Sequence, residues 1–136
     1  IDFATAKVDI STGETLVKMY VGFATDYPTD SLAPMYLMKA ADVAMNIKRG
    51  DIAIKYLDRL IKDYPNYDKL PDCYFMRGYV YETVLADINK AKEAYELFLI
   101  QYPNHPLAAD TRIIIQNLSL SDEEIIKMIM EKNMAQ

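Results

Sequence analysis

Residues 91–108 read AKEAYELFLIQYPNHPLA, and this stretch decides the fold. Ala91, Tyr95 and Phe98 stand 12, 8 and 5 residues before Pro103, so their spacing places them on one face of a helix. Pro103 has no backbone N–H to continue that helix. The stretch therefore predicts an apolar helical face that ends at a tyrosine–proline pair.

The same pattern occurs three times in the chain. Its tyrosine–proline pairs are separated by 65 − 28 = 37 and 103 − 65 = 38 residues. At the same three offsets before each proline stand mainly apolar residues, namely Leu16, Tyr20 and Phe23, then Ala53, Leu57 and Leu60, then Ala91, Tyr95 and Phe98. Three copies of one pattern indicate a repeated helical unit.

A second helix follows each tyrosine–proline pair. Pro34, Pro71 and Ala109 stand six residues beyond the three prolines, and segment 34–47 aligns with 71–84 without a gap. Proline is tolerated in the first turn of a helix, where its missing N–H has no intrahelical partner anyway. Ala41 aligns with Gly78, and such small residues are typical of positions where two helices pack closely. Each unit is therefore a pair of helices.

Helix signals along the chain give a map of seven helices. Ser11 with Glu14, and Ser121 with Glu124, match the capping-box pattern, and Asp51 is a candidate N-cap. No segment alternates with period two between hairpin turns, so no strand is predicted. The helices are expected near residues 12–26, 32–48, 51–63, 71–85, 88–101, 106–118 and 121–134.

These helices are predicted to stack in one all-α domain spanning residues 1–136. Its parts are a half-repeat at 12–28, repeats at 31–65 and 68–103, and a C-terminal half-repeat with a capping helix at 106–134. The last helix carries Ile125, Ile126, Ile129 and Met130 on overlapping faces. We expect it to close the open end of the stack, with self-association as the alternative.

Composition excludes several functions. With 15 basic and 20 acidic residues, the chain lacks the basic surface that a nucleic-acid-binding protein needs. Cys73 is the only cysteine and His105 the only histidine, so no zinc pattern or intramolecular disulfide exists and a nucleophile–base pair is not indicated. No apolar run reaches the roughly 18 residues of a membrane span. We therefore expect no catalytic residue, no metal and no cofactor.

The repeated helix pair resembles the tetratricopeptide repeat family, whose unit has about 34 residues. The resemblance rests on Gly78, Tyr81, Ala91, Tyr95 and Pro103, and more weakly on Ala41, Ala44, Ala53, Leu57 and Pro65. The chain departs from the family at the usual first core tryptophan, where it has Leu37 and Tyr74, and at the leucine before the glycine, where it has Ala40 and Arg77. The resemblance implies a right-handed α-α superhelix and a protein-binding function.

The segment from Tyr95 to Ala108 looks like the periplasmic branch of this family in Gram-negative bacteria, which includes the outer-membrane assembly lipoprotein and the Tol–Pal coordinator protein. The resemblance implies a periplasmic or outer-membrane-associated location. Because the chain begins with Ile1 rather than methionine, it is typical of a processed or excised protein. A lipid anchor upstream of Ile1 is compatible with this origin.

The first helix of each pair lines the concave face of such a superhelix. The resemblance implies that ten side chains form this face and bind a partner, namely Met35, Met38, Asp42, Met45, Asn46, Asp72, Phe75, Tyr79, Glu82 and Thr83. For the methionines, gap filling between stacked helices is the alternative.

The leading hypothesis is a monomeric or weakly associating adaptor of the cell envelope that binds a protein or peptide. The alternative is a structural scaffold fragment or a homo-oligomerisation module without a free peptide site.

Overall fold

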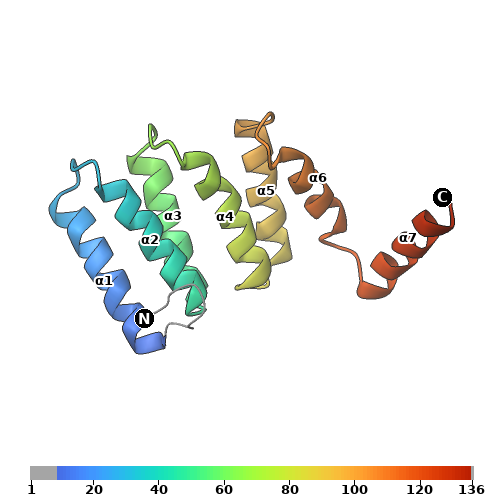
Figure 1. Ribbon diagram of the computed structural model, residues 1–136, viewed down its shortest axis with the longest axis horizontal. Coiled ribbons are helices and arrows are strands. Elements are labelled where there is room, and N and C mark those ends of the chain that lie inside the picture. Colours follow the sequence, from blue (N-terminus) through green and yellow to red (C-terminus); the bar gives the residue numbers. More distant parts are fainter. Residues whose placement is uncertain (1–8, 136) are drawn as a thin grey trace.

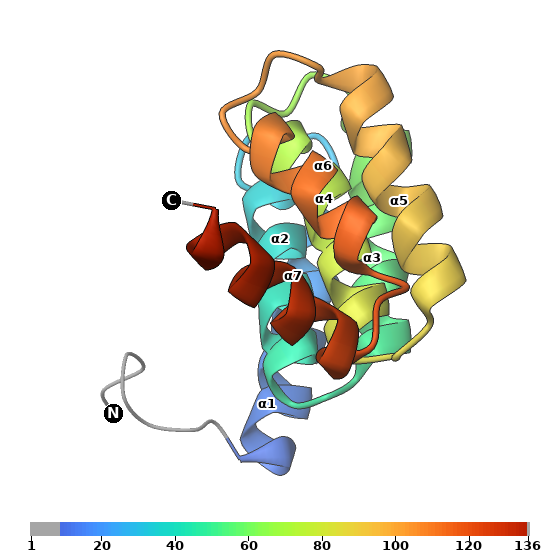
Figure 2. The ribbon, with the colours of Figure 1, turned by 90° about the vertical axis from the view of Figure 1, so that its right-hand side faces the viewer.

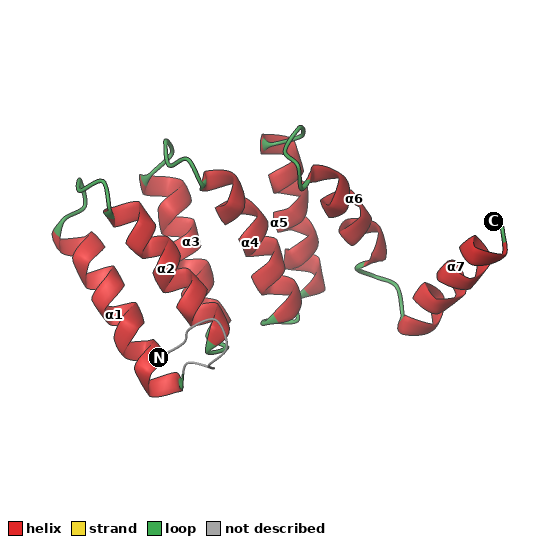
Figure 3. Ribbon diagram, in the orientation of Figure 1, coloured by secondary structure: helices red, strands yellow, loops and turns green. Residues whose placement is uncertain are grey.

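The computed structural model describes residues 9–135. Within this range the chain forms seven helices and no strand, as the sequence predicts. Consecutive helices run in opposite directions along the stack (Figures 1 and 3). The helices are α1 (Ile10–Asp26), α2 (Ala33–Asn46), α3 (Gly50–Asp63), α4 (Leu70–Thr83), α5 (Ile88–Gln101), α6 (Ala108–Asn117) and α7 (Asp122–Met134).

The repeat pairs form two layers. Seen from the end of the stack, α2, α4 and α6 lie on one side, and α3 and α5 lie on the other (Figure 2). Each helix packs against its neighbours in sequence, from α1 on α2 through to α5 on α6. The molecule is therefore an all-α solenoid.

The three tyrosine–proline turns have the same backbone structure. The N–H groups of Tyr27, Tyr64 and Tyr102 donate to the carbonyl four residues earlier, at 2.8, 2.9 and 2.8 Å. Their φ angles are −127°, −128° and −135°, and their ψ angles are 61°, 60° and 61°. Each tyrosine carbonyl then accepts a hydrogen bond from the residue three positions on, at 3.1, 3.0 and 3.2 Å. The sequence repeat is thus a structural repeat down to its hydrogen bonds.

The core lies between the two layers. The apolar stripe of α3 (Ala53, Leu57 and Leu60) and that of α5 (Ala91, Tyr95 and Phe98) have no exposed surface. Gly78 of α4 lies so close to α5 that an added Cβ would stand 2.4 Å from Cδ1 of Tyr95. A small residue is required at this crossing because the Tyr95 ring occupies the space that a side chain would take.

Several predicted helix starts are confirmed and two are wrong. Pro34 and Pro71 lie in the first turns of their helices, and Ser121 and Glu124 form the predicted capping box. The N-cap of α1 is Asp9 rather than Ser11, because the Asp9 carboxylate accepts the N–H of Thr12 at 2.8 Å. The N-cap of α3 is Arg49. Asp51 lies inside the first turn of the helix, where the helix dipole favours a negative charge.

The expectation that the last helix caps the stack is not met. α7 extends away from α6 beyond the end of the solenoid (Figure 1), and none of its residues is buried. Ile126, Ile129 and Met130 are 56%, 55% and 59% exposed. Its capping box stabilises the first turn of the helix by local hydrogen bonds rather than by packing against the repeats.

None of the helices between residues 9 and 135 combines the length and the apolar character that crossing a membrane requires.

Candidate partner-binding face

The ten residues predicted to bind a partner come from equivalent positions of α2 and α4. Each residue in α2 stands 37 positions before its counterpart in α4, as Asp42 does before Tyr79. None of the ten is buried, whereas the residues between them, such as Leu37, Ala41 and Cys73, are fully buried. We call the surface formed by these ten residues the α2–α4 face.

Two of the three methionines of this face also support the core. Met38 and Met45 are partly buried and pack against the central apolar cluster. The Sγ of Cys73 lies 3.4 Å from the Sδ of Met38 and donates a weak hydrogen bond to it. Met38 therefore joins α2 to α4, in agreement with the gap-filling alternative, and Met35 is left half-buried.

The two aromatic residues of the face differ in their availability. The Phe75 ring centroid lies 5.5 Å from that of Tyr95 and 5.7 Å from that of Phe98, so Phe75 packs against α5. Tyr79 is 42% exposed. Tyr79 is therefore the better candidate for direct contact with a partner, because an aromatic ring offers a large apolar area and a polar hydroxyl.

The polar residues at the ends of the two helices are partly occupied by local bonds. The Oη of Tyr95 donates to Oε1 of Glu82 at 2.8 Å, so this carboxylate accepts the hydroxyl proton of a buried tyrosine. Burial, together with this bond, raises the pKa of Tyr95 above its usual value. Thr83 donates through Oγ1 to the carbonyl of Tyr79 at 2.8 Å, and Asn46 is exposed at the end of α2.

Asp42 has a different environment from the other carboxylates of the face. Asp42 is half-buried, and within residues 9–135 no hydrogen bond or ion pair of its carboxylate is found. Burial raises the pKa of Asp42 above its usual value, and the charges of Lys39 and Lys69 oppose that rise. Asp72, in contrast, lies in the first turn of α4, where the helix dipole favours a negative charge.

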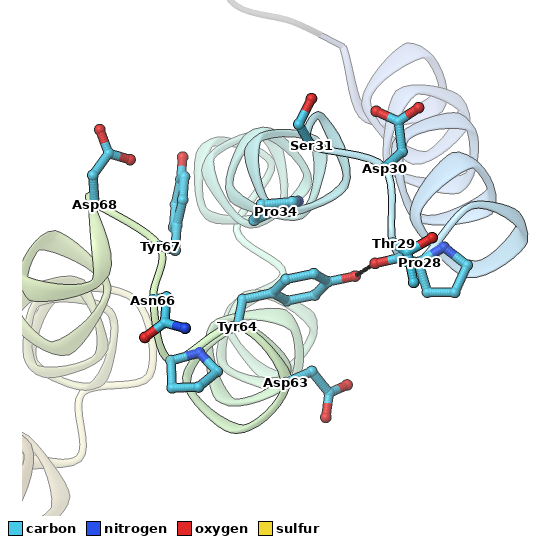
Figure 4. Close-up of a pocket in the computed structure, with 11 residues that line it drawn as sticks. Pro28, Thr29, Asp30, Ser31, Pro34, Asp63, Tyr64, Asn66, Tyr67 and Asp68 are labelled. Carbon is cyan, nitrogen blue, oxygen red and sulfur yellow. Dashed lines mark hydrogen bonds between the residues drawn. The ribbon is translucent and has the colours of Figure 1, made fainter.

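A hollow that the sequence did not predict lies between the loops that join the repeats. It has a volume of about 560 Å³, and its walls are the α1–α2 and α3–α4 loops (Figure 4). The side chain of Tyr64 extends across this hollow, and its hydroxyl donates a hydrogen bond to the carbonyl of Pro28 at 2.7 Å. The tyrosine–proline pairs at residues 27–28 and 64–65 are the sequence signal for this joint, which ties one unit to the next.

Cys73 and His105 do not form a reactive pair. His105 Nδ1 accepts the N–H of Leu107 at 3.0 Å, which makes His105 a turn residue. Cys73 is fully buried, and burial raises the pKa of its thiol to about 12.

The Cys73 thiol is expected to react at least roughly 1,000-fold more slowly with Ellman's reagent in the folded protein than in denaturant, at about pH 8. A pKa of about 12, against 9.0 for a free thiol, leaves far less thiolate, and burial blocks access as well. The rate of colour release measures this. Equal rates in the two conditions would contradict the buried position.

Comparison with known protein families matches the tetratricopeptide repeat at residues 36–67 and 72–105. The chain therefore contains two tetratricopeptide repeats, and they cover α2 with α3 and α4 with α5. A comparison with curated proteins found no match.

Proposed function

We propose that the protein is a non-enzymatic adaptor of the bacterial cell envelope whose α2–α4 face binds a peptide or helix of a protein partner. Tetratricopeptide repeats generally mediate protein–protein interactions and are typically not enzymes. Both matched repeats contribute equivalent positions to this face. The proposal therefore places binding on the surface that the two repeats share.

The unpaired carboxylate of Asp42 is the observation that carries the proposal. The carboxylate of Asp42 is partly desolvated and has no protein partner within residues 9–135, so a basic group of a bound partner would offset the cost of its burial. Tyr79, at the equivalent position one repeat later, presents an exposed aromatic ring. A suitable partner would place a lysine or arginine against the carboxylate of Asp42 and an apolar side chain against the ring of Tyr79.

The assignment to the cell envelope has a separate basis. It rests on the similarity of the segment from Tyr95 to Ala108 to periplasmic members of the family. Fractionation of the native cells with an antibody to this chain tests it. Recovery in the cytoplasmic fraction would remove the envelope location and leave the adaptor proposal in place.

Replacing Asp42 by asparagine is expected to raise the free energy of unfolding at neutral pH. The pKa of Asp42 is raised in the folded state because burial disfavours its charged form, so folding stability falls as pH rises from the unfolded-state pKa through the folded-state pKa. Asparagine removes this cost at pH 7, and the benefit disappears below about pH 3.8. Urea unfolding of the original protein and the variant, at pH 7 and below about pH 3.8, measures the difference in their free energies of unfolding. A destabilised variant at neutral pH would show that the charge is satisfied.

Photo-crosslinking tests the proposed face directly. A photoreactive phenylalanine analogue at Tyr79 is expected to capture a partner in the native host. The matched control is the same analogue at Glu96, an exposed position of α5 in the opposite layer. Adducts at Tyr79 but not at Glu96 support the proposal, whereas adducts at Glu96 alone would place the binding surface on the other layer.

The scaffold or homo-oligomer alternative is favoured by one observation, the exposed apolar residues of α7. Removing residues 119–136 distinguishes the two functions. If the intact chain is oligomeric in sedimentation velocity and the shortened chain is a monomer, α7 is an association element. If both are monomers at all concentrations, the alternative fails.

A further inference from the structure

A hollow with a largely apolar lining lies where α1, the end of α2 and α3 meet. Its volume is about 300 Å³. Ligand pockets of about this size are typically lined by apolar side chains with a few polar groups at fixed positions. We call it the α1–α3 hollow, and its apolar lining consists of Val17, Ala44, Ile47, Ile52 and Tyr56.

The floor and the walls of this hollow differ in burial. Val17, Ala44 and Ile47 are 8%, 0% and 5% exposed, so they form a floor that belongs to the core. Ile52 and Tyr56 of α3 are half-buried and form the walls. An apolar group that enters the hollow would therefore remove the walls from water, which is favourable.

The charged residues of the hollow leave an excess of positive charge. Glu14 accepts a hydrogen bond from Arg49 at 3.4 Å, so its charge is already balanced. Lys18 and Lys55 also line the hollow, and within residues 9–135 neither forms an ion pair. The Nζ of Lys55 lies 5.6 Å from the ring centroid of Tyr56, which places a positive charge at the wall. This charge stands out in a chain whose net charge is −5.

The equivalent hollow one repeat later is different. Its volume is about 250 Å³, and it is lined by residues of α4 and α5. Ile52 and Tyr56 correspond there to Lys90 and Ala94, since 90 − 52 = 38 and 94 − 56 = 38. The second unit therefore folds in the same way with a charged residue in place of an apolar wall, so the repeat architecture alone does not require Ile52.

The α1–α3 hollow is separate from the other surfaces of the molecule. Glu14, Val17 and Lys18 stand about 100° or more around α1 from Leu16 and Phe23, at roughly 100° per residue. None of the residues that line the hollow belongs to the α2–α4 face. The hollow is thus enclosed by three helices of the stack and does not involve the half-buried apolar stripe of α1.

We infer that the α1–α3 hollow binds a small carboxylic acid with an apolar chain. The chain lies against Ile52 and Tyr56, and the carboxylate lies near the ammonium groups of Lys18 and Lys55. At roughly 30 Å³ for each water-sized group, the volume suits a chain of about eight to ten carbon atoms. The positive charge selects the carboxylate over a neutral or cationic head group. Failure of this site would leave the proposed partner-binding function unaffected.

Titration of the full chain with octanoate tests the site. In methyl NMR spectra of isoleucine-labelled protein, we expect saturable shifts of Ile47 and Ile52 and none of Ile100, which is 73% exposed on α5. Two further probes, 1-octanol and octylamine, have the same chain with a neutral and a cationic head group. Octanoate is expected to bind about fivefold more tightly than octanol, as unpaired surface lysines allow, and octylamine more weakly than either.

Two substitutions separate the charge from the apolar wall. Lys55→Met keeps an apolar stem and removes the charge, so it should weaken octanoate about threefold and leave octanol unchanged. Its matched control is Lys127→Met, at an exposed position of α7. Ile52→Gln should weaken both octanoate and octanol, whereas Ile100→Gln should weaken neither. The methyl signals of the other isoleucines report whether each variant is folded.

Three results would overturn the inference. The first is the absence of saturable shifts at Ile47 and Ile52 at octanoate concentrations below those at which it forms micelles. The second is equal affinity for octanoate and octylamine, because the lysines would then select nothing. The third is an equal loss of octanoate affinity in Lys55→Met and Lys127→Met, which would show that binding responds only to the total charge of the chain.

Discussion

Replacing Phe98 by alanine is expected to lower the free energy of unfolding by about 3–5 kcal/mol, the usual cost of removing a buried phenylalanine. Phe98 is fully buried in α5, and its ring contacts those of Phe75, Tyr102 and His105. The cavity would open in the core between the two layers. Urea unfolding followed by circular dichroism measures the loss.

Phe23→Ala is the matched control for this substitution. Phe23 is the same residue type at the same position of the repeat, but it is half-buried and contacts only Tyr27 and Tyr36 among the aromatic rings within residues 9–135. Its loss is expected to cost about 1–2 kcal/mol, since less apolar surface returns to water. Equal costs at the two positions would contradict the difference in cover between α1 and α5.

The crossing of α4 and α5 gives the second large effect. Gly78→Ala is expected to cost about 1–3 kcal/mol through overpacking against Tyr95, partly offset by a gain of about 1 kcal/mol in helix propensity. Tyr95→Leu is also destabilising, because it leaves a cavity and removes the bond to Glu82. Combining the two recreates the alanine and leucine found one unit earlier as Ala41 and Leu57.

The double variant is therefore expected to be more stable than the sum of the single effects predicts, by about 1–2 kcal/mol. Gly22→Ala is the control for helix propensity. Gly22 lies in α1 with nothing near its missing Cβ, so alanine there should stabilise the protein by up to about 1 kcal/mol. Additive effects of Gly78→Ala and Tyr95→Leu would show that glycine is not required by the ring.

The repeat made most of the fold predictable. Once the tyrosine–proline pairs were aligned, the apolar offsets indicated which residues of α3 and α5 are buried. The same alignment, which pairs Ala41 with Gly78, indicated that Gly78 lies where two helices approach closely. Helix ends were predicted within about two residues because proline and capping residues act locally.

Features that depend on a particular environment were not predictable. α7 has the apolar residues of a capping helix, but its sequence does not specify whether α6 offers a matching surface. The cap at Asp9 was missed because Ser11 and Glu14 gave a competing local pattern. For the α2–α4 face, the register predicted which side chains lie outside the core. It did not indicate that Glu82 is bound by Tyr95 or that Asp42 has no partner.

The most direct test of the proposed adaptor function is the affinity of Asp42→Asn for the segment that Tyr79 captures by photo-crosslinking. Fluorescence anisotropy with that segment as a labelled peptide measures it, and urea unfolding at pH 7 gives the stability of the same variant. We predict at least a roughly 10-fold loss of affinity, typical of a lost charge-assisted hydrogen bond, in a protein that is as stable as the original or more so. Unchanged affinity in the folded variant would contradict the account.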